Sequence, residues 1–171
     1  MAAKSFVRLV GAKITRIFGV VVSAGSANDG DFPALDAAGK LDVSMMPTGV
    51  GVNTKSAVAS EALAANDLVD LWNNAGTLNV RKADATIAGK LADGFVKSGV
   101  ASGASALVYL AGNVITGLSG LTPGTSQYLS TTAGLRTEDV SAYVAGNVVM
   151  PVGYSLSATD MMFEPLIDIT L

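Results

Sequence analysis

Residues 68–82, with the sequence LVDLWNNAGTLNVRK, contain the pattern that decides the fold. Two apolar-rich runs, residues 68–72 and 78–82, flank a segment, residues 73–77, that is rich in Asn and contains Gly76. Asn and Gly tolerate the left-handed backbone that a tight turn demands. The stretch therefore predicts a strand, a turn and a second strand.

Runs of strand length recur along the rest of the chain, separated by turns that contain glycine. We expect strands near residues 93–100, 106–110, 114–116, 127–130, 135–136, 147–156, 161–165 and 166–171, with 127–130 facing 135–136. A spacing of about ten residues is typical of small antiparallel sandwiches and barrels. The predicted fold is mainly β: a small antiparallel β-sandwich or barrel over residues 56–171 with an N-terminal arm. Single helical turns remain an alternative at residues 61–63 and 119–125, the second of which is better interpreted as a loop.

Composition excludes several kinds of chemistry. The 171 residues contain no Cys and no His, which removes thiolate nucleophiles, cysteine metal sites and the usual general base near neutral pH. We therefore expect no enzyme activity, cofactor or metal. Hydrophobic residues make up 50% of the chain and charged residues 15%. Because no apolar run is long enough to span a membrane, we expect the surplus apolar surface to contact other protein subunits.

The first 30 residues differ from the rest in charge. Lys4, Arg8, Lys13 and Arg16 precede the first acidic residue, Asp29. Residues 29–171 hold the other seven basic side chains and all 14 acidic ones, a net charge of −7. A basic arm on an acidic body favours docking between subunits or onto an acidic neighbour.

The conformation and role of this arm leave alternatives open. Apolar residues lie at mostly helical spacing, which favours a helix. Gly11, Gly19 and a run of valines weaken that interpretation, so the sequence favours a helix and an extended strand to the same degree. A signal peptide, a membrane-surface helix, a nucleic-acid contact and the first strand of the β domain are the competing interpretations. We interpret residues 1–30 as an interaction arm without nucleic-acid or membrane partners. Its expected partner-binding residues are Lys4, Phe6, Arg8, Lys13, Arg16 and Phe18.

Residues 31–55 are expected to form a turn-rich connector. The stretch FPALDAAGKLDVSMMP, residues 32–47, is bracketed by Pro33 and Pro47, each of which disfavours helix at the preceding residue. Gly39 supplies a residue able to adopt a positive φ, so the chain is expected to double back there.

Four phrases of the chain resemble those of bacteriophage virion surface proteins, namely head decoration (cement) proteins and the connector regions of tail fibres. They are ALDAAGKLDVSMMP at 34–47, ASEALAAND at 59–67, VRKAD at 80–84 and GLTPG at 120–124. Resemblance to the decoration family implies a structural protein on the capsid surface of the virion. It also implies a homotrimer that binds the major capsid protein and clamps neighbouring subunits. The alternative is a tail-fibre or other host-contacting protein with a carbohydrate-binding β domain.

Other candidate sites favour structural interpretations. Residues 28–31 (NDGD) resemble part of a calcium loop but lack its later Glu, which favours a solvated turn. Gly39 and Gly89 each precede a Lys without the rest of a phosphate loop, so both are expected in turns. The carboxylate pairs Asp67 with Asp70 and Glu138 with Asp139 are interpreted as solvated surface charge. The aromatic residues Trp72, Tyr109, Tyr128, Tyr143 and Tyr154 are expected to pack in the core in preference to forming a sugar platform.

Overall fold

The computed structural model describes residues 5–46 and 52–171, which belong to two compact units. The first unit is Met1–Gly51 and the second is Val52–Leu171. The second unit enters its first strand at Thr54, so the last two residues of the expected 31–55 connector lie in that strand.

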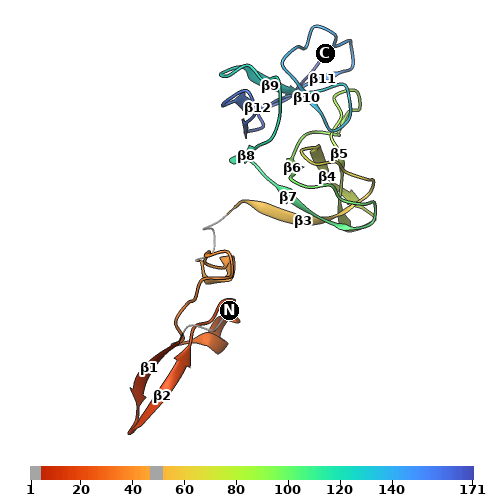
Figure 1. The fold of residues 1–171 in the computed structure, drawn as a ribbon. Helices are drawn as coiled ribbons and strands as arrows, with labels where there is room; N and C mark the ends of the chain where they lie inside the picture. Colours follow the sequence, from red (N-terminus) through yellow and green to blue (C-terminus); the bar gives the residue numbers. More distant parts are fainter. Residues whose placement is uncertain (1–4, 47–51) are drawn as a thin grey trace. The chain divides into compact units, whose positions relative to one another are not determined.

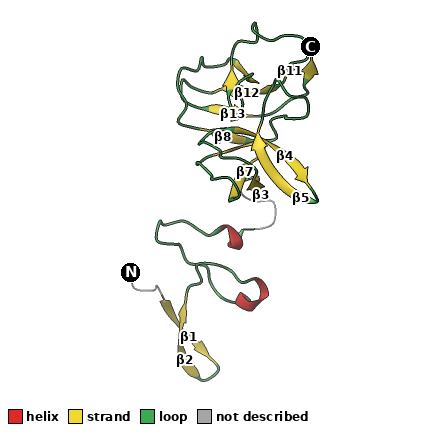
Figure 2. Ribbon diagram, turned by 90° about the vertical axis from the view of Figure 1, so that its right-hand side faces the viewer, coloured by secondary structure: helices red, strands yellow, loops and turns green. Residues whose placement is uncertain are grey.

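The arm is a β-hairpin. Strand β1 (Ser5–Val10) pairs antiparallel with β2 (Lys13–Phe18) in a two-stranded sheet of their own (Figure 2). Gly11, at φ 63°, turns the chain between them. This left-handed turn is incompatible with a helix running through the arm, so the extended alternative is correct and the helical one is wrong.

The other described residues of the first unit, 19–46, form turns, one bridge and two short helices. Val20 and Pro33 form an isolated parallel bridge, and two short 3₁₀ helices follow the hairpin, η1 (Gly25–Asn28) and η2 (Val43–Met45). The chain doubles back at Gly39, with φ 74°, as expected. Asp36 stabilises this turn because its Oδ1 accepts hydrogen bonds from the N–H groups of Ala38 and Lys40, both at 2.8 Å. The turn carries no flanking strands.

The second unit is mainly β, as predicted, and is built on a closed five-stranded barrel. Its strands are β3 (Thr54–Ala59), β4 (Leu68–Asn74), β5 (Thr77–Lys82), β6 (Gly94–Val96) and β7 (Ser105–Tyr109). They lie in the order β3-β5-β4-β6-β7, and β7 pairs with β3 to close the barrel. The β3–β5 pair is parallel and the other pairs are antiparallel.

The hairpin of β4 and β5 forms where the sequence predicts it. Ala75 and Gly76 have φ values of 50° and 89°, and Asn73 Oδ1 accepts a hydrogen bond of 2.7 Å from the Gly76 N–H. Two consecutive residues with positive φ match the right-handed twist of the strands that they join. The turn also sets the register, which places Asp70 opposite Arg81.

A second sheet lies against the barrel. It has the order β10 (Arg136–Thr137), β9 (Ser126–Leu129), β12 (Pro151–Ser155), β13 (Met161–Phe163) and β8 (Asn113–Ile115). Strand β11 (Val148–Val149) pairs with β14 (Ile169–Thr170). In both views of the second unit, β11 and β12 lie at one end and β3 and β7 at the other (Figures 1 and 2).

Two apolar cores hold this unit together. One fills the barrel with small and β-branched side chains, among them Ala57, Val80 and Val108. The other joins the barrel to the second sheet, and its members include Phe95 and Phe163, whose rings meet edge to face at 5.6 Å. The second core therefore makes the barrel and the sheet a single packed body.

Several sequence expectations for this unit need correction. Strand β3 was not predicted, the expected strand at 93–100 is limited to β6, and the C-terminal strand is limited to β14. The helical alternative at 61–63 is wrong, because Leu63 forms an antiparallel bridge with Val100. Residues 119–125 form a loop with a turn, which agrees with the interpretation as a loop.

Candidate functional site

The β1–β2 register gathers apolar side chains on one face of the arm. Residues directly opposite each other in an antiparallel pair project to the same side of a sheet. The pairs Ser5–Phe18, Val7–Arg16 and Leu9–Ile14 therefore share a face. We call five residues of this face, Val7, Leu9, Ile14, Arg16 and Phe18, the arm face.

This face is strongly exposed. The exposed fractions are 59% for Val7, 69% for Leu9, 79% for Ile14 and 52% for Phe18, and Arg16 is exposed beside them. An isolated two-stranded hairpin is at best marginally stable in water, and apolar side chains displayed together mark an interaction site. A partner that covered these four apolar side chains would gain on the order of 1–2 kcal/mol from each.

Five of the six partner-binding residues expected from the sequence lie on the hairpin. Arg16 and Phe18 lie on the arm face. Lys13, which is also exposed, pairs with Val10 and therefore lies on the opposite face of the hairpin. In the backbone, Phe6 pairs with Ile17 and Arg8 with Thr15. Lys4 lies outside the described residues.

Val7, Leu9 and Ile14 are not among the partner-binding residues expected from the sequence. The signal that could have found them is a local period of two, Val7-Arg8-Leu9 before Gly11 and Lys13-Ile14-Thr15 after it, although Phe6, Val10 and Ile17 interrupt it. This period of two is the pattern of a strand, whereas the spacing of Phe6, Val10 and Ile14 also fits a helix.

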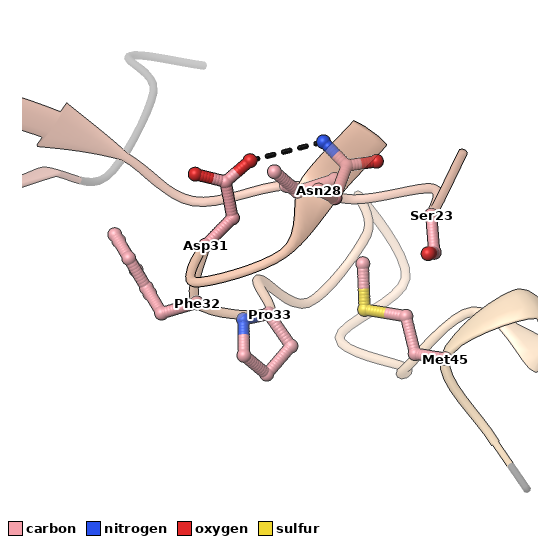
Figure 3. A pocket seen from close by; sticks show the side chains of 7 residues that line it. Ser23, Asn28, Asp31, Phe32, Pro33 and Met45 are labelled. Atoms are coloured by element: carbon pink, nitrogen blue, oxygen red, sulfur yellow. Dashed lines mark hydrogen bonds between the residues drawn. The ribbon is translucent and has the colours of Figure 1, made fainter. Parts of the chain in front are cut away.

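A shallow hollow of about 190 Å³ lies in the first unit after the hairpin (Figure 3). Asn28 and Asp31 line it and are joined by a hydrogen bond of 3.0 Å from Asn28 Nδ2 to Asp31 Oδ2. Asn28 Oδ1 accepts a second hydrogen bond, of 2.6 Å, from the Ala24 N–H. The Asn28 amide therefore holds the turn of residues 24–31. Within residues 5–46 and 52–171, no three His, Cys, Asp or Glu side chains are grouped as metal ligands would be.

Asp67 and Asp70 are buried, so their interpretation as solvated surface charge is wrong. Asp70 accepts a hydrogen bond of 2.6 Å from Arg81 Nε, and Asp67 Oδ2 lies 3.4 Å from Lys82 Nζ. Burial raises the pKa of Asp70, although Arg81 opposes that effect. Asp67 Oδ2 also accepts a hydrogen bond of 2.8 Å from the Ala64 N–H. Both carboxylates thus bind neighbouring groups of the barrel and are fixed in structural roles.

Glu138 and Asp139 are held by hydrogen bonds from neighbouring loops. Glu138 Oε1 accepts hydrogen bonds from the Thr122 N–H and from Gln127 Nε2, both at 2.8 Å. Asp139 accepts from the N–H and the hydroxyl of Ser141. These donors lower the pKa of each carboxyl, so both are ionised at neutral pH.

The aromatic residues are divided between packing and exposure. Tyr109 stacks on Phe95 at 5.4 Å and packs with Tyr143 against the core that joins barrel and sheet, which agrees with the core interpretation. Trp72 lies under the Arg81 guanidinium at 4.8 Å and donates from its indole N–H to Ser60. Tyr154 is exposed, contrary to expectation.

In the described parts of the chain, no helix has the length and apolarity needed to cross a membrane.

No protein-family model and no curated protein matches the chain. Among solved structures, it is similar to the head fiber gp8.5 N base of bacteriophage phi29, with 16% sequence identity and a TM-score of 0.39. The similarity covers 67% of this chain and 95% of that one.

Proposed function

We propose that the chain is a structural protein of a bacteriophage virion. In this proposal it binds the outer surface of the capsid through its arm and stabilises the shell by clamping neighbouring capsid subunits. The observation that carries the proposal is the exposed arm face on a hairpin whose two strands form a sheet of their own. The four phrases that resemble those of virion surface proteins favour a phage virion as the particle.

The shape of the arm fits a docking role. Both β1 and β2 are edge strands, because each has only one neighbour in its sheet. Edge strands present unpaired backbone N–H and C=O groups that a strand of another chain can pair with. The arm therefore offers a partner backbone hydrogen bonds along its edges and apolar contact across its face.

Charge favours an acidic partner for the arm. Lys13 and Arg16 are exposed on β2, while residues 29–171 carry a net charge of −7. Acidic capsid surface and the acidic body of a second copy both complement this charge. The proposal includes both contacts: copies of the chain associate as a homotrimer, and the trimer binds the major capsid protein. Sedimentation equilibrium is expected to give three times the monomer mass at micromolar concentration, whereas a monomer would count against the trimer.

Clamping has a direct consequence for the particle. A protein that binds only the assembled shell stabilises it by mass action, and weak contributions add over many lattice sites. Capsids stripped of this protein should break at lower temperature than intact ones and regain their resistance when it is added back. Equal thermal stability with and without it, together with loss of host adsorption, would instead favour the host-contacting alternative.

A further inference from the structure

The turn between β1 and β2 determines which backbone groups of the arm face outward. Gly11 and Ala12 form a two-residue loop, and the positive φ of Gly11, 63°, in its first position is the pattern of a type II′ turn. In such a hairpin the closing pair, Val10 and Lys13, exchanges two backbone hydrogen bonds. The following pairs then alternate between non-hydrogen-bonded and hydrogen-bonded.

This alternation leaves one edge of the hairpin with unpaired backbone groups. Val7 and Leu9 stand opposite Arg16 and Ile14 in non-hydrogen-bonded pairs, so their N–H and C=O groups point away from β2. Within the described residues, β1 has no neighbouring strand on that side. The side chains of Val7 and Leu9 belong to the exposed arm face. The β1 edge therefore combines free backbone donors and acceptors with exposed apolar side chains.

The edge of β2 is different, because another part of the first unit already pairs with the chain that leaves it. The Val20 N–H donates to the Phe32 carbonyl at 3.0 Å, and the Val20 carbonyl accepts from the Ala34 N–H at 2.8 Å. Since Val20 lies an even number of residues after Arg16, these bonds are on the side of β2 that faces away from β1. A Cβ atom at Gly19 would stand 2.6 Å from the Cβ of Ala34, so this contact is close. The β2 edge is thus partly occupied within its own chain, whereas the β1 edge is open.

We propose that an extended segment of the capsid protein adds to the free edge of β1 as a third strand. The proposal rests on the function proposed above and specifies how the arm binds. A two-stranded hairpin alone is at best marginally stable in water, whereas three strands with an apolar face reach independent stability. The added strand pairs with the outward N–H and C=O groups of Val7 and Leu9.

The hairpin also specifies the chemistry of this segment. Side chains of a strand alternate between the two faces of a sheet, so every second residue of the added strand extends the arm face and is apolar. The charged residues of the arm, residues 1–18, are all basic: Lys4, Arg8, Lys13 and Arg16. Acidic residues at the intervening positions complement that charge. The partner is therefore a strand-length run of alternating apolar and acidic residues.

Residue-resolved hydrogen exchange tests the proposal on the full chain, both free and bound to purified capsids that lack it. Cosedimentation first establishes that the chain is bound. Capsids are then expected to slow exchange of the Val7 and Leu9 amides at least about tenfold, because a hydrogen-bonded amide exchanges only when its structure opens. The amides of Ile14 and Arg16, which face the β2 edge, are expected to exchange as they do in the free chain.

Two proline variants separate the edges by a second measurement. A proline is tolerated at an edge position whose N–H points outward, so Val7→Pro removes a donor from the β1 edge and Arg16→Pro removes one from the β2 edge. Val7→Ala and Arg16→Ala are the controls, since both keep the N–H. Val7→Pro is expected to bind capsids about tenfold more weakly than Val7→Ala, whereas Arg16→Pro should bind as Arg16→Ala does. Because Val7 and Arg16 pair with each other, both prolines perturb the hairpin at the same position.

Four results would overturn the proposal. In the first, capsids bind the chain but leave Val7 and Leu9 unprotected, or slow the Ile14 and Arg16 amides equally. In the second, the two proline variants lose the same affinity relative to their alanine controls. Either result would refute strand addition at β1 and leave capsid docking by the arm intact. In the third, protection of Val7 and Leu9 appears without capsids and rises with protein concentration, which would assign the edge to a second copy. The fourth is absence of cosedimentation by the wild type, which would refute capsid binding itself and this proposal with it.

Discussion

Replacing Gly153 by Ala is expected to destabilise the second unit severely. Gly153 lies in β12 at a register shift between Pro151 and Gly153, with φ 142°. A Cβ atom there would stand 1.9 Å from the carbonyl oxygen of Met162 and 3.1 Å from the backbone nitrogen of Glu164. An ordinary carbon–oxygen contact is about 3.3 Å, so the strands must separate by more than about 1 Å.

The cost follows from what holds the two strands together. Gly153 pairs with Phe163, and the Glu164 N–H donates to the Val152 carbonyl at 3.0 Å. Strain from overpacking costs about 1–3 kcal/mol, a side chain at this φ about 1–3 kcal/mol and a weakened backbone hydrogen bond about 1 kcal/mol. The expected loss is therefore about 3–7 kcal/mol, a large share of the usual stability of about 5–15 kcal/mol.

Thermal unfolding followed by circular dichroism measures this loss. For a unit of this size the melting temperature should fall by about 10 °C or more. Gly99→Ala is the matched control, because a Cβ at Gly99 meets only the Leu63 carbonyl oxygen at 3.5 Å, an ordinary contact. If Gly153→Ala melted within about 2 °C of the wild type, the described pairing of β12 with β13 would be wrong.

Three further predictions concern the core and the buried charges. Phe163→Ala should cost about 3–5 kcal/mol in a urea titration, whereas Ile167→Ala, at a site 88% exposed, should cost little. Arg81→Met should lower the free energy of unfolding by about 1–3 kcal/mol at pH 7, because it leaves the buried Asp70 carboxylate without its cation. The loss should be smaller in acid, where protonation of Asp70 removes the buried charge. An equal loss of stability at both pH values would contradict this prediction. Hydrogen bonds lower the pKa of Glu138 from its ordinary 4.5, so the ionised side chain contributes fully to folding stability at pH 7. This contribution is lost as the pH falls through the lowered pKa, and the melting temperatures of the wild type and Glu138→Gln should therefore converge in acid. A gap between the two melting temperatures that stays constant with pH would refute this prediction.

The hairpins could be predicted because their turns are determined locally. Asn73, Ala75 and Gly76 fix the β4–β5 turn, and the same reasoning locates the turn between β9 and β10. The β4–β5 register also determines the buried ion pair, because a two-residue loop at 75–76 places Asp70 opposite Arg81. Counting residue pairs outward from the predicted turn identifies Arg81 as the partner of Asp70, which argues against a solvated charge at Asp70.

Other features depend on contacts between distant segments. Strand β3, with the sequence TKSAVA, has weak apolar alternation, and it becomes a strand because β5 and β7 pair with it on either side. The position of Glu138 depends on Thr122 in the loop after β8 and on Gln127 in β9, which no local pattern connects. In the arm, helical and strand spacing both fit the apolar residues, and the left-handed turn at Gly11 decides between them.

Binding of the full chain to purified capsids that lack it tests the central proposal most directly. Ile14→Asp places a charge in the middle of the arm face, whereas Ile167→Asp makes the same change at a site in the second unit that is also strongly exposed. In a cosedimentation assay, Ile14→Asp is expected to weaken capsid binding at least about tenfold, since burying an unpaired carboxylate is costly. Ile167→Asp should bind as the wild type does. Equal binding by both variants, or loss of binding only in Ile167→Asp, would contradict docking through the arm.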